Sequence, residues 1–119
     1  MAFDGKQMVR IAKRMRQATG YLEIGMPQQA LDRLELLGAL GPFEAEVELL
    51  RGEAMRMQHR YEEAAASFAI AARKFPPESK AAWLALSLCC RQAGDSDRAV
   101  KMLGLARGAK PPEPGPHCL

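Results

Sequence analysis

The side chains best suited to act as nucleophiles, bases or metal ligands in this chain of 119 residues are three cysteines and two histidines. Cys89 and Cys90 are adjacent and Cys118 stands next to the last residue, which is too irregular for a disulfide framework. His59 falls in a predicted turn with only His117 besides, so neither a metal site nor a general base is indicated. A glycine-rich phosphate loop and paired helix histidines are also missing from the sequence. We therefore expect a protein that is not an enzyme, with no cofactor and no bound metal.

Basic side chains gather at the start of the chain. Residues 1–20 contain five Lys or Arg against one Asp, a local charge of +4 in a chain of net charge +3. At about 100° per residue the cations lie opposite an apolar stripe, which predicts an amphipathic helix. The cations either contact an anion, such as nucleic acid or a membrane surface, or form a solvated outer face. We favour the solvated face, do not expect a nucleic acid partner, and keep anion binding as an alternative. The cations are Lys6, Arg10, Lys13, Arg14 and Arg16, and the stripe is Met8, Ile11, Met15, Ala18 and Leu22.

Three features of the sequence bear on the compartment. No run of about 20 apolar residues occurs, so no transmembrane segment is expected. Basic residues from Lys6 onward interrupt the early apolar positions, which is unlike a signal peptide. The few, irregularly spaced cysteines fit a reducing environment. Together these features predict a cytoplasmic location.

The composition predicts an all-α protein. Apolar residues make up 48% of the chain and aromatic residues only 6%, so the core must be built from Leu, Ala, Met and Val, which suits helices better than sheets. Gly25 with Pro27 predicts a tight turn between two helices. Asp4 with Gln7 predicts the start of the first helix, and Ser79 that of the fifth. The six predicted helices span about residues 5–24, 27–37, 43–57, 61–75, 80–92 and 97–108, the last capped by Asp95 or Ser96.

The fourth predicted helix is apolar on nearly all sides. It contains six alanines between positions 64 and 72, together with Phe68 and Ile70. A helix of this kind is expected to be buried on more than one side. In the helix that follows, Cys89 and Cys90 are interpreted as small core residues rather than reactive thiols.

The pattern of the fourth helix recurs on both sides of it. Four anchor residues have near-equivalents 34 residues earlier and 35 residues later. A period in this range indicates stacked helical hairpins, because each hairpin has an apolar face that it cannot bury alone. The anchors are Ala64, Phe68, Ala71 and Pro76, preceded by Ala30, Leu34, Leu37 and Pro42 and followed by Ala99, Leu103, Ala106 and Pro111.

With these residues in place, the chain resembles the tetratricopeptide repeat family over about residues 11–112. The third unit shows Trp83, Gly94 and Ala99 at the family spacing, and the second shows Gly52 and Tyr61, while the first unit lacks the early large aromatic residue. The resemblance implies an α-solenoid of three helix-turn-helix hairpins in a right-handed superhelix. It also implies repeats at about 11–44, 45–78 and 80–112 within a domain of residues 1–110, followed by a disordered proline-rich tail at 111–119.

In this family the first helices of the repeats line a concave groove that holds a peptide or helix of another protein. The resemblance therefore implies a non-enzymatic protein-interaction module, such as an adaptor or an assembly chaperone. Small residues such as Gly52 and Ala64 are expected where two helices cross closely. The residues expected to bind the partner are Met15, Thr19, Leu22, Leu49, Glu53, Arg56, Met57, Leu84, Leu88 and Arg91, with Ala12, Glu23, Glu46, Ala81 and Gln92 beside them.

These groove positions are mainly apolar. Family members that grip an acidic C-terminus use a cluster of Lys, Arg and Asn, which this groove does not offer. An apolar groove flanked by a few charges suits an amphipathic helix or a hydrophobic peptide. Two alternatives stay open: the chain's own tail or a second copy occupies the groove, or the protein is a small chaperone of the kind that sheathes secreted subunits in bacteria.

The last predicted helix has a wide apolar surface and no further helix to cover it. Its apolar residues span an arc of about 220°, more than one packed face needs. The tail, the partner or a second copy could cover this surface, so a homodimer through the last hairpin is a further hypothesis. The residues are Ala99, Val100, Met102, Leu103, Leu105 and Ala106.

Overall fold

The structure is a computed structural model, which describes residues 4–75, 80–95 and 98. Within these ranges the chain is helical and contains no β-strand, which confirms the all-α prediction. The predicted sixth helix, apart from Arg98, and the predicted tail lie outside the described residues. The elements are α1 (Gly5–Glu23), α2 (Pro27–Arg33), the 3-10 turn η1 (Gly41–Phe43), α3 (Glu44–Met57), α4 (Tyr61–Lys74) and α5 (Ala81–Gln92).

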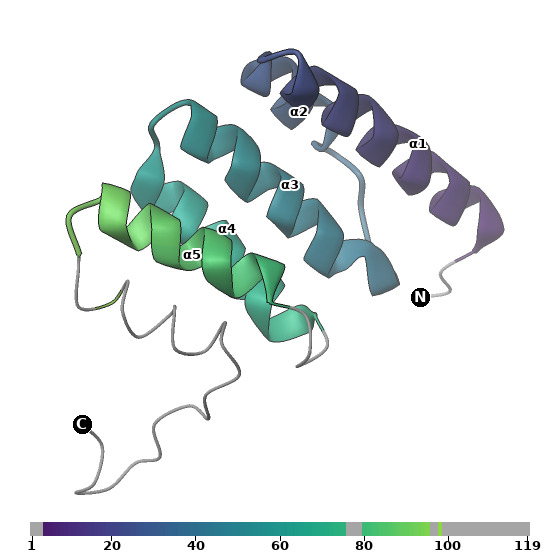
Figure 1. Ribbon diagram of the computed structural model, residues 1–119. Helices are drawn as coiled ribbons and strands as arrows, with labels where there is room; N and C mark the ends of the chain where they lie inside the picture. Colours follow the sequence, from purple (N-terminus) through teal and green to yellow (C-terminus); the bar gives the residue numbers. More distant parts are fainter. Residues whose placement is uncertain (1–3, 76–79, 96–97, 99–119) are drawn as a thin grey trace, which may run out of the picture.

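Each helix packs on the next helix along the chain. Contacts join α1 to α2, α2 to α3, α3 to α4 and α4 to α5, and α1 also touches α3. Figure 1 shows α1, α3 and α5 in the nearer layer, with α2 and α4 behind them. This arrangement of helix-turn-helix hairpins is the predicted α-solenoid.

The turns use residues that tolerate a left-handed backbone. Gly25, directly before Met26 and the helix-starting Pro27, has φ +75°, and Gly94 after α5 has φ +90°. Between α3 and α4 the same role falls to His59, with φ +62°. Its Nδ1 lies 2.6 Å from the Tyr61 hydroxyl oxygen, and the side chain is exposed, as expected for a turn histidine.

The second helix is shorter than the sequence indicates. The prediction extends it to Leu37, but α2 ends at Arg33, and Leu36 adopts φ +56° with 90% of its surface exposed. Leu34 and Leu37 are nevertheless buried, so the apolar spacing correctly identified core residues in a segment that is not helical. Beyond Arg33 the backbone leaves the helical path, and side chains of α1 and α3 bind carbonyl groups of the segment that follows.

Four of these carbonyls accept hydrogen bonds from distant side chains. Gln7 Nε2 donates to Leu37 O at 2.6 Å and to Ala39 O at 3.0 Å. Arg10 donates to Leu36 O at 2.9 Å and to Leu37 O at 3.2 Å, and Arg51 of α3 donates to Leu34 O at 2.9 Å. Gln7, Arg10 and Arg51 are called the carbonyl clamp below. The clamp gives partners to carbonyls that have no helical partner, because carbonyl groups beyond a helix end still need one.

The start of α1 agrees with the prediction in part. The Asp4 carboxylate accepts a hydrogen bond from the backbone N–H of Gln7 at 2.8 Å, so Asp4 is the N-cap. The Gln7 side chain does not complete the pair, because it belongs to the carbonyl clamp. Met8, assigned to the apolar stripe, is 41% exposed. With 19 residues against seven, α1 extends past α2, and its first turns lack a helix to cover them.

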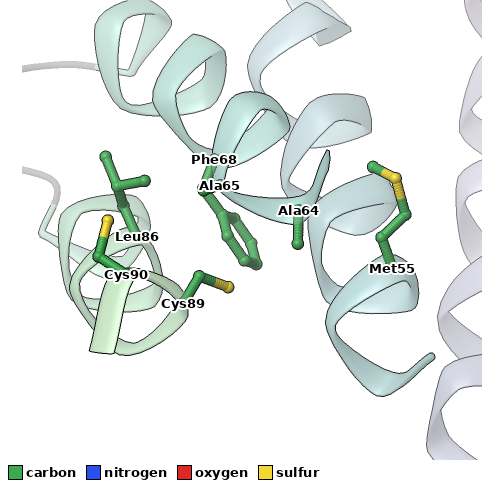
Figure 2. Packing of buried hydrophobic residues seen from close by; sticks show 7 residues of the cluster. All are labelled: Met55, Ala64, Ala65, Phe68, Leu86, Cys89 and Cys90. Carbon is green, nitrogen blue, oxygen red and sulfur yellow. The ribbon is translucent and has the colours of Figure 1, made fainter. Parts of the chain in front are cut away.

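The largest fully buried side chain is Phe68 of α4. Its ring lies so close to α3 that a β-carbon added to Gly52 would stand 2.6 Å from it. Figure 2 shows the ring directed between Ala64 and the thiol of Cys89. Glycine is therefore required at position 52 by the ring of Phe68, which confirms the expectation of a close crossing there.

The other half of the core joins α1, α2 and α3. Ile11, Ala18, Ala30, Leu34 and Val47 are fully buried in one cluster, while Phe68 and the two cysteines belong to another. As expected, α4 is buried against two neighbours, α3 and α5. Not all of its apolar surface is covered, however: Ala66 is exposed and Ala69 and Ile70 are half-buried, because only two sides of the helix have a described partner.

Candidate functional site

A hollow of about 550 Å³ lies between α1 and the start of α3. It exists because these two helices touch only lightly, whereas α3 packs closely on α4. Phe43 of η1 and Glu46 of α3 line one side of the hollow. The other side is one face of α1, formed by Ala12, Met15, Arg16, Thr19, Gly20 and Glu23. We call this space the α1–α3 hollow.

Apolar and polar atoms divide the hollow between floor and rim. Ala12, Met15 and Phe43 are half-buried and supply apolar surface, while Glu23 and Glu46 are exposed. The hydroxyl of Thr19 donates to Met15 O at 2.9 Å, within its own helix. An opening of this kind, with an apolar floor and a few charges at its edge, is suited to a side chain from another molecule.

A second exposed apolar feature lies on α5. Leu84 is 49% exposed and Leu88 is 40% exposed, and their spacing of four residues places them on one face of the helix. Arg91 and Gln92 are exposed at the end of the same helix. The two leucines do not line the α1–α3 hollow, so the predicted groove residues occupy two separate regions.

Leu22 and Leu49, both expected in the groove, pack against the core. Leu22 contacts the buried cluster of α1, α2 and α3. Leu49 contacts the cluster around Phe68 and also a smaller cluster of α4 and α5, formed by Ala71, Ala72 and Ala82. Each is only half-buried, but neither lines the hollow. A large polar substitution at Leu49 would therefore disturb the fold as well as the surface.

Glu53 and Arg56, also groove residues by prediction, pair with each other. The guanidinium Nη2 of Arg56 lies 2.7 Å from the Glu53 carboxylate. This hydrogen bond raises the pKa of Arg56 above its usual value. Met57, the next residue of α3, is half-buried.

The hollow contains three residues that the sequence did not indicate: Arg16, Gly20 and Phe43. Arg16 was assigned to the solvated basic face, yet it lies only about 40° from Ala12 on the helix, so a wider arc would have included it. Phe43 follows Pro42 in a 3-10 turn, and no periodicity marks such a position.

The basic face of α1 is only partly free. The guanidinium of Arg10 is engaged in the carbonyl clamp and Arg14 is half-buried, whereas Lys6, Lys13 and Arg16 are exposed. Four of the five side chains are exposed, including that of Arg10, so the prediction of an outer face holds for all but Arg14. Because Arg10 is committed to backbone carbonyls, the face offers fewer free cations than the sequence suggests.

The cysteines of α5 are buried, free thiols. Burial raises the pKa of Cys89 to about 11 and also raises that of Cys90. A thiol with a raised pKa is a poor nucleophile near neutral pH.

In the part of the chain that the structure describes, no group of His, Cys, Asp and Glu side chains is arranged to hold a metal ion. Among the same residues, no helix has the length and apolar character needed to span a membrane.

Comparison with known proteins identifies one family. Residues 15–76 and 56–114 match the family model described as tetratricopeptide repeat, and the two overlapping matches cover most of the chain. A search among curated protein sequences gives no significant match. The family match agrees with the resemblance found from the anchor residues and with the helical hairpins of the structure.

Proposed function

The chain belongs to the tetratricopeptide repeat family, and on that premise we propose that it binds a segment of another protein across the face formed by α1, α3 and α5. Repeats of this family generally mediate protein–protein interaction and are not enzymes. The proposed ligand is an amphipathic helix or an apolar peptide, and the proposed role is that of an adaptor or assembly chaperone in the cytoplasm.

The observation that carries this proposal is the α1–α3 hollow. Four side chains chosen from the sequence as groove residues on α1 line it, together with Glu46 of α3. A peptide lying across this face could insert a side chain into the hollow and rest apolar residues on Leu84 and Leu88. Exposed apolar side chains on α5 favour such a contact, because burial of apolar surface is the main favourable term in association. The four α1 residues are Ala12, Met15, Thr19 and Glu23.

Site-specific photo-crosslinking tests the proposal. A photoreactive amino acid replaces Thr19 in the hollow or Leu84 on α5, both of which are exposed. We expect both positions to crosslink to the same partner protein in cell extract. The control carries the photoreactive residue at Gln29, which is exposed on α2 in the other layer, and should yield little of that partner.

A second set of variants tests whether the contact contributes affinity. Leu84→Arg with Leu88→Arg places two charges on the α5 face and should abolish capture of the crosslinked partner. Gln29→Arg with Gln28→Ala is a control on α2. Equal crosslinking from Gln29 and from Thr19, or unchanged capture by the double leucine variant, would refute the proposed binding face.

A further inference from the structure

The carboxylates of the α1–α3 hollow differ from the others on the same helices. Three of the four glutamates of α3 face a cation: Glu44 lies 3.7 Å from Lys74, Glu48 lies 3.1 Å from Arg51, and Glu53 lies 2.7 Å from Arg56. Glu46, the glutamate of α3 that lines the hollow, takes part in no ion pair within the described residues. Its charge faces the opening instead.

Glu23 is placed where a carboxylate does not stabilise its own helix. It is the last residue of α1, whose last turn has no basic side chain. A negative charge at this end opposes the helix dipole, which favours cations there. The helix dipole favours a carboxylate at Glu46, which stands in the first turn of α3, but does not favour one at Glu23. Neither Glu23 nor Glu46 has an ion-pair partner in the part of the chain that the structure describes, so two such carboxylates border the same apolar floor, and Glu23 lies at an unfavourable helix position.

From this arrangement we propose that the α1–α3 hollow selects a basic segment, in which a large apolar side chain enters the hollow and an adjacent Lys or Arg reaches Glu23 and Glu46. The inference rests on the proposed function and adds the chemistry of the ligand. The volume of about 550 Å³ accommodates a large side chain. Among the described residues that line the hollow, Arg16 is the one cation, so their net charge is −1 and the ligand's cation should lie toward the two glutamates.

Selection from a displayed library of random peptides tests the inference with the full chain. We expect the wild-type pool to be enriched in Lys or Arg directly beside a large apolar residue. The charge-reversal variant Glu23→Lys with Glu46→Lys should lose this enrichment and bind the best wild-type peptide about tenfold more weakly, as expected for two exposed charge contacts. The control Glu35→Lys with Glu62→Lys makes the same change of net charge at exposed positions outside the hollow and should leave both results unaltered.

The outcomes separate this inference from the proposed function. If the wild-type chain selects acidic peptides, the basic ligand is overturned and the binding face stands. The same holds if the selected peptides still bind after the Glu23 and Glu46 reversal but not after Leu84→Arg with Leu88→Arg. Equal loss in the Glu35 and Glu62 control shows a general charge effect and also overturns the inference. A wild-type chain that enriches no peptide, or peptides that survive both sets of changes, overturns the proposed function itself.

Discussion

The α3–α4–α5 block and the α1–α2 hairpin are held together in different ways. In the block, small residues let the helices approach closely, and the ring of Phe68 fills the space between them against Gly52. In the hairpin, α2 has only seven residues, and the segment after it is fixed by hydrogen bonds from Gln7, Arg10 and Arg51. The block depends on packing, and the hairpin depends also on polar side chains bound to backbone.

The unequal packing of the two regions explains the position of the α1–α3 hollow. Close packing in the block leaves little space between α3 and α4. Beside α1, whose contact with α3 is slight, the hollow remains open. The hairpin meets α3 through the buried cluster around Ile11, Leu34 and Val47 and through the bond from Arg51, and these contacts leave the hollow between α1 and the start of α3 unfilled.

The packed block should be most sensitive at Phe68. Replacement by Ala removes the largest fully buried side chain and should lower the free energy of unfolding by about 3–5 kcal/mol. Urea unfolding followed by circular dichroism measures the loss. Phe75→Ala, the same change at a half-buried position after α4, should cost clearly less.

If Phe68→Ala is too unstable to fold, Phe68→Leu provides a milder version of the same test. It retains most of the apolar volume and should cost about 1–2 kcal/mol. Equal losses for Phe68 and Phe75 would contradict the view that one ring organises the block.

The block should also make stability depend on pH through Cys89. Burial raises the pKa of this thiol from an ordinary value of 9.0 to about 11, so the folded state holds the proton more tightly than the unfolded state. The contribution to stability is complete below pH 9 and is lost as the pH rises toward 11. We expect a loss of about 2 kcal/mol from this group between pH 8 and pH 11.

The measurement compares urea unfolding of the wild type and of Cys89→Ala, both in a Cys118→Ser background, at several pH values. Alanine has no ionisable group, so the difference between the two chains isolates the thiol. A difference in the free energy of unfolding that does not change between pH 8 and pH 11 would mean that Cys89 is accessible to water.

Replacing two glycines by alanine should change the stability of the fold in opposite directions. Gly52→Ala gains helix propensity, but its β-carbon would lie 2.6 Å from the Phe68 ring, and a fully buried ring has no free space to move into. We expect a net loss of about 1–2 kcal/mol. Gly20→Ala in α1 meets nothing within 4 Å and should gain about 0.5–1 kcal/mol.

Thermal and urea unfolding of both glycine variants measure whether the free energy of unfolding falls or rises. The double change Gly52→Ala with Phe68→Leu should recover part of the loss, because the smaller side chain makes room for the methyl group. A stabilising Gly52→Ala would show that the α3–α4 crossing is looser than the structure indicates.

The sequence predicted most of the packing and less of the polar structure. Helix positions, the buried anchors Ala64, Phe68 and Ala71, and the turn at Gly25 follow from periodicity and from residues with special backbone preferences. Each of these signals is local or repeats along the chain. The sequence predicts part of the lining of the hollow, because the face of α1 that contains Met15 and Thr19 follows from the family's repeat.

The end of α2 and the full rim of the hollow could not be predicted. The spacing of Leu34 and Leu37 continues the helical pattern, and no residue near them indicates that Arg10 and Arg51 bind carbonyl groups of this segment. These donors stand 26 and 17 residues from their acceptors, so only the fold brings them together. Arg16 was missed because its charge suggested solvent, whereas its angle on α1 places it at the hollow.

A small effect on stability is expected from the carbonyl clamp. Arg51→Met keeps a long side chain but leaves Leu34 O without its side-chain donor and also removes the ion pair with Glu48, and should cost about 1 kcal/mol. Arg56→Met on the same helix is a matched control, because each arginine pairs with the glutamate three residues earlier, but only Arg51 also donates to a backbone carbonyl. The loss of that partly exposed ion pair should cost about 0.5 kcal/mol or less.

Hydrogen exchange distinguishes the two arginines more sharply than global stability does. If Arg51 holds the end of α2, its loss should speed exchange of the amides of residues 30–34 by local opening, while those of α4 exchange as before. Arg56→Met should change neither set. Faster exchange throughout the chain in Arg51→Met would mean that the arginine supports the whole stack, and the contrast between a packed block and a clamped hairpin would fail at that residue.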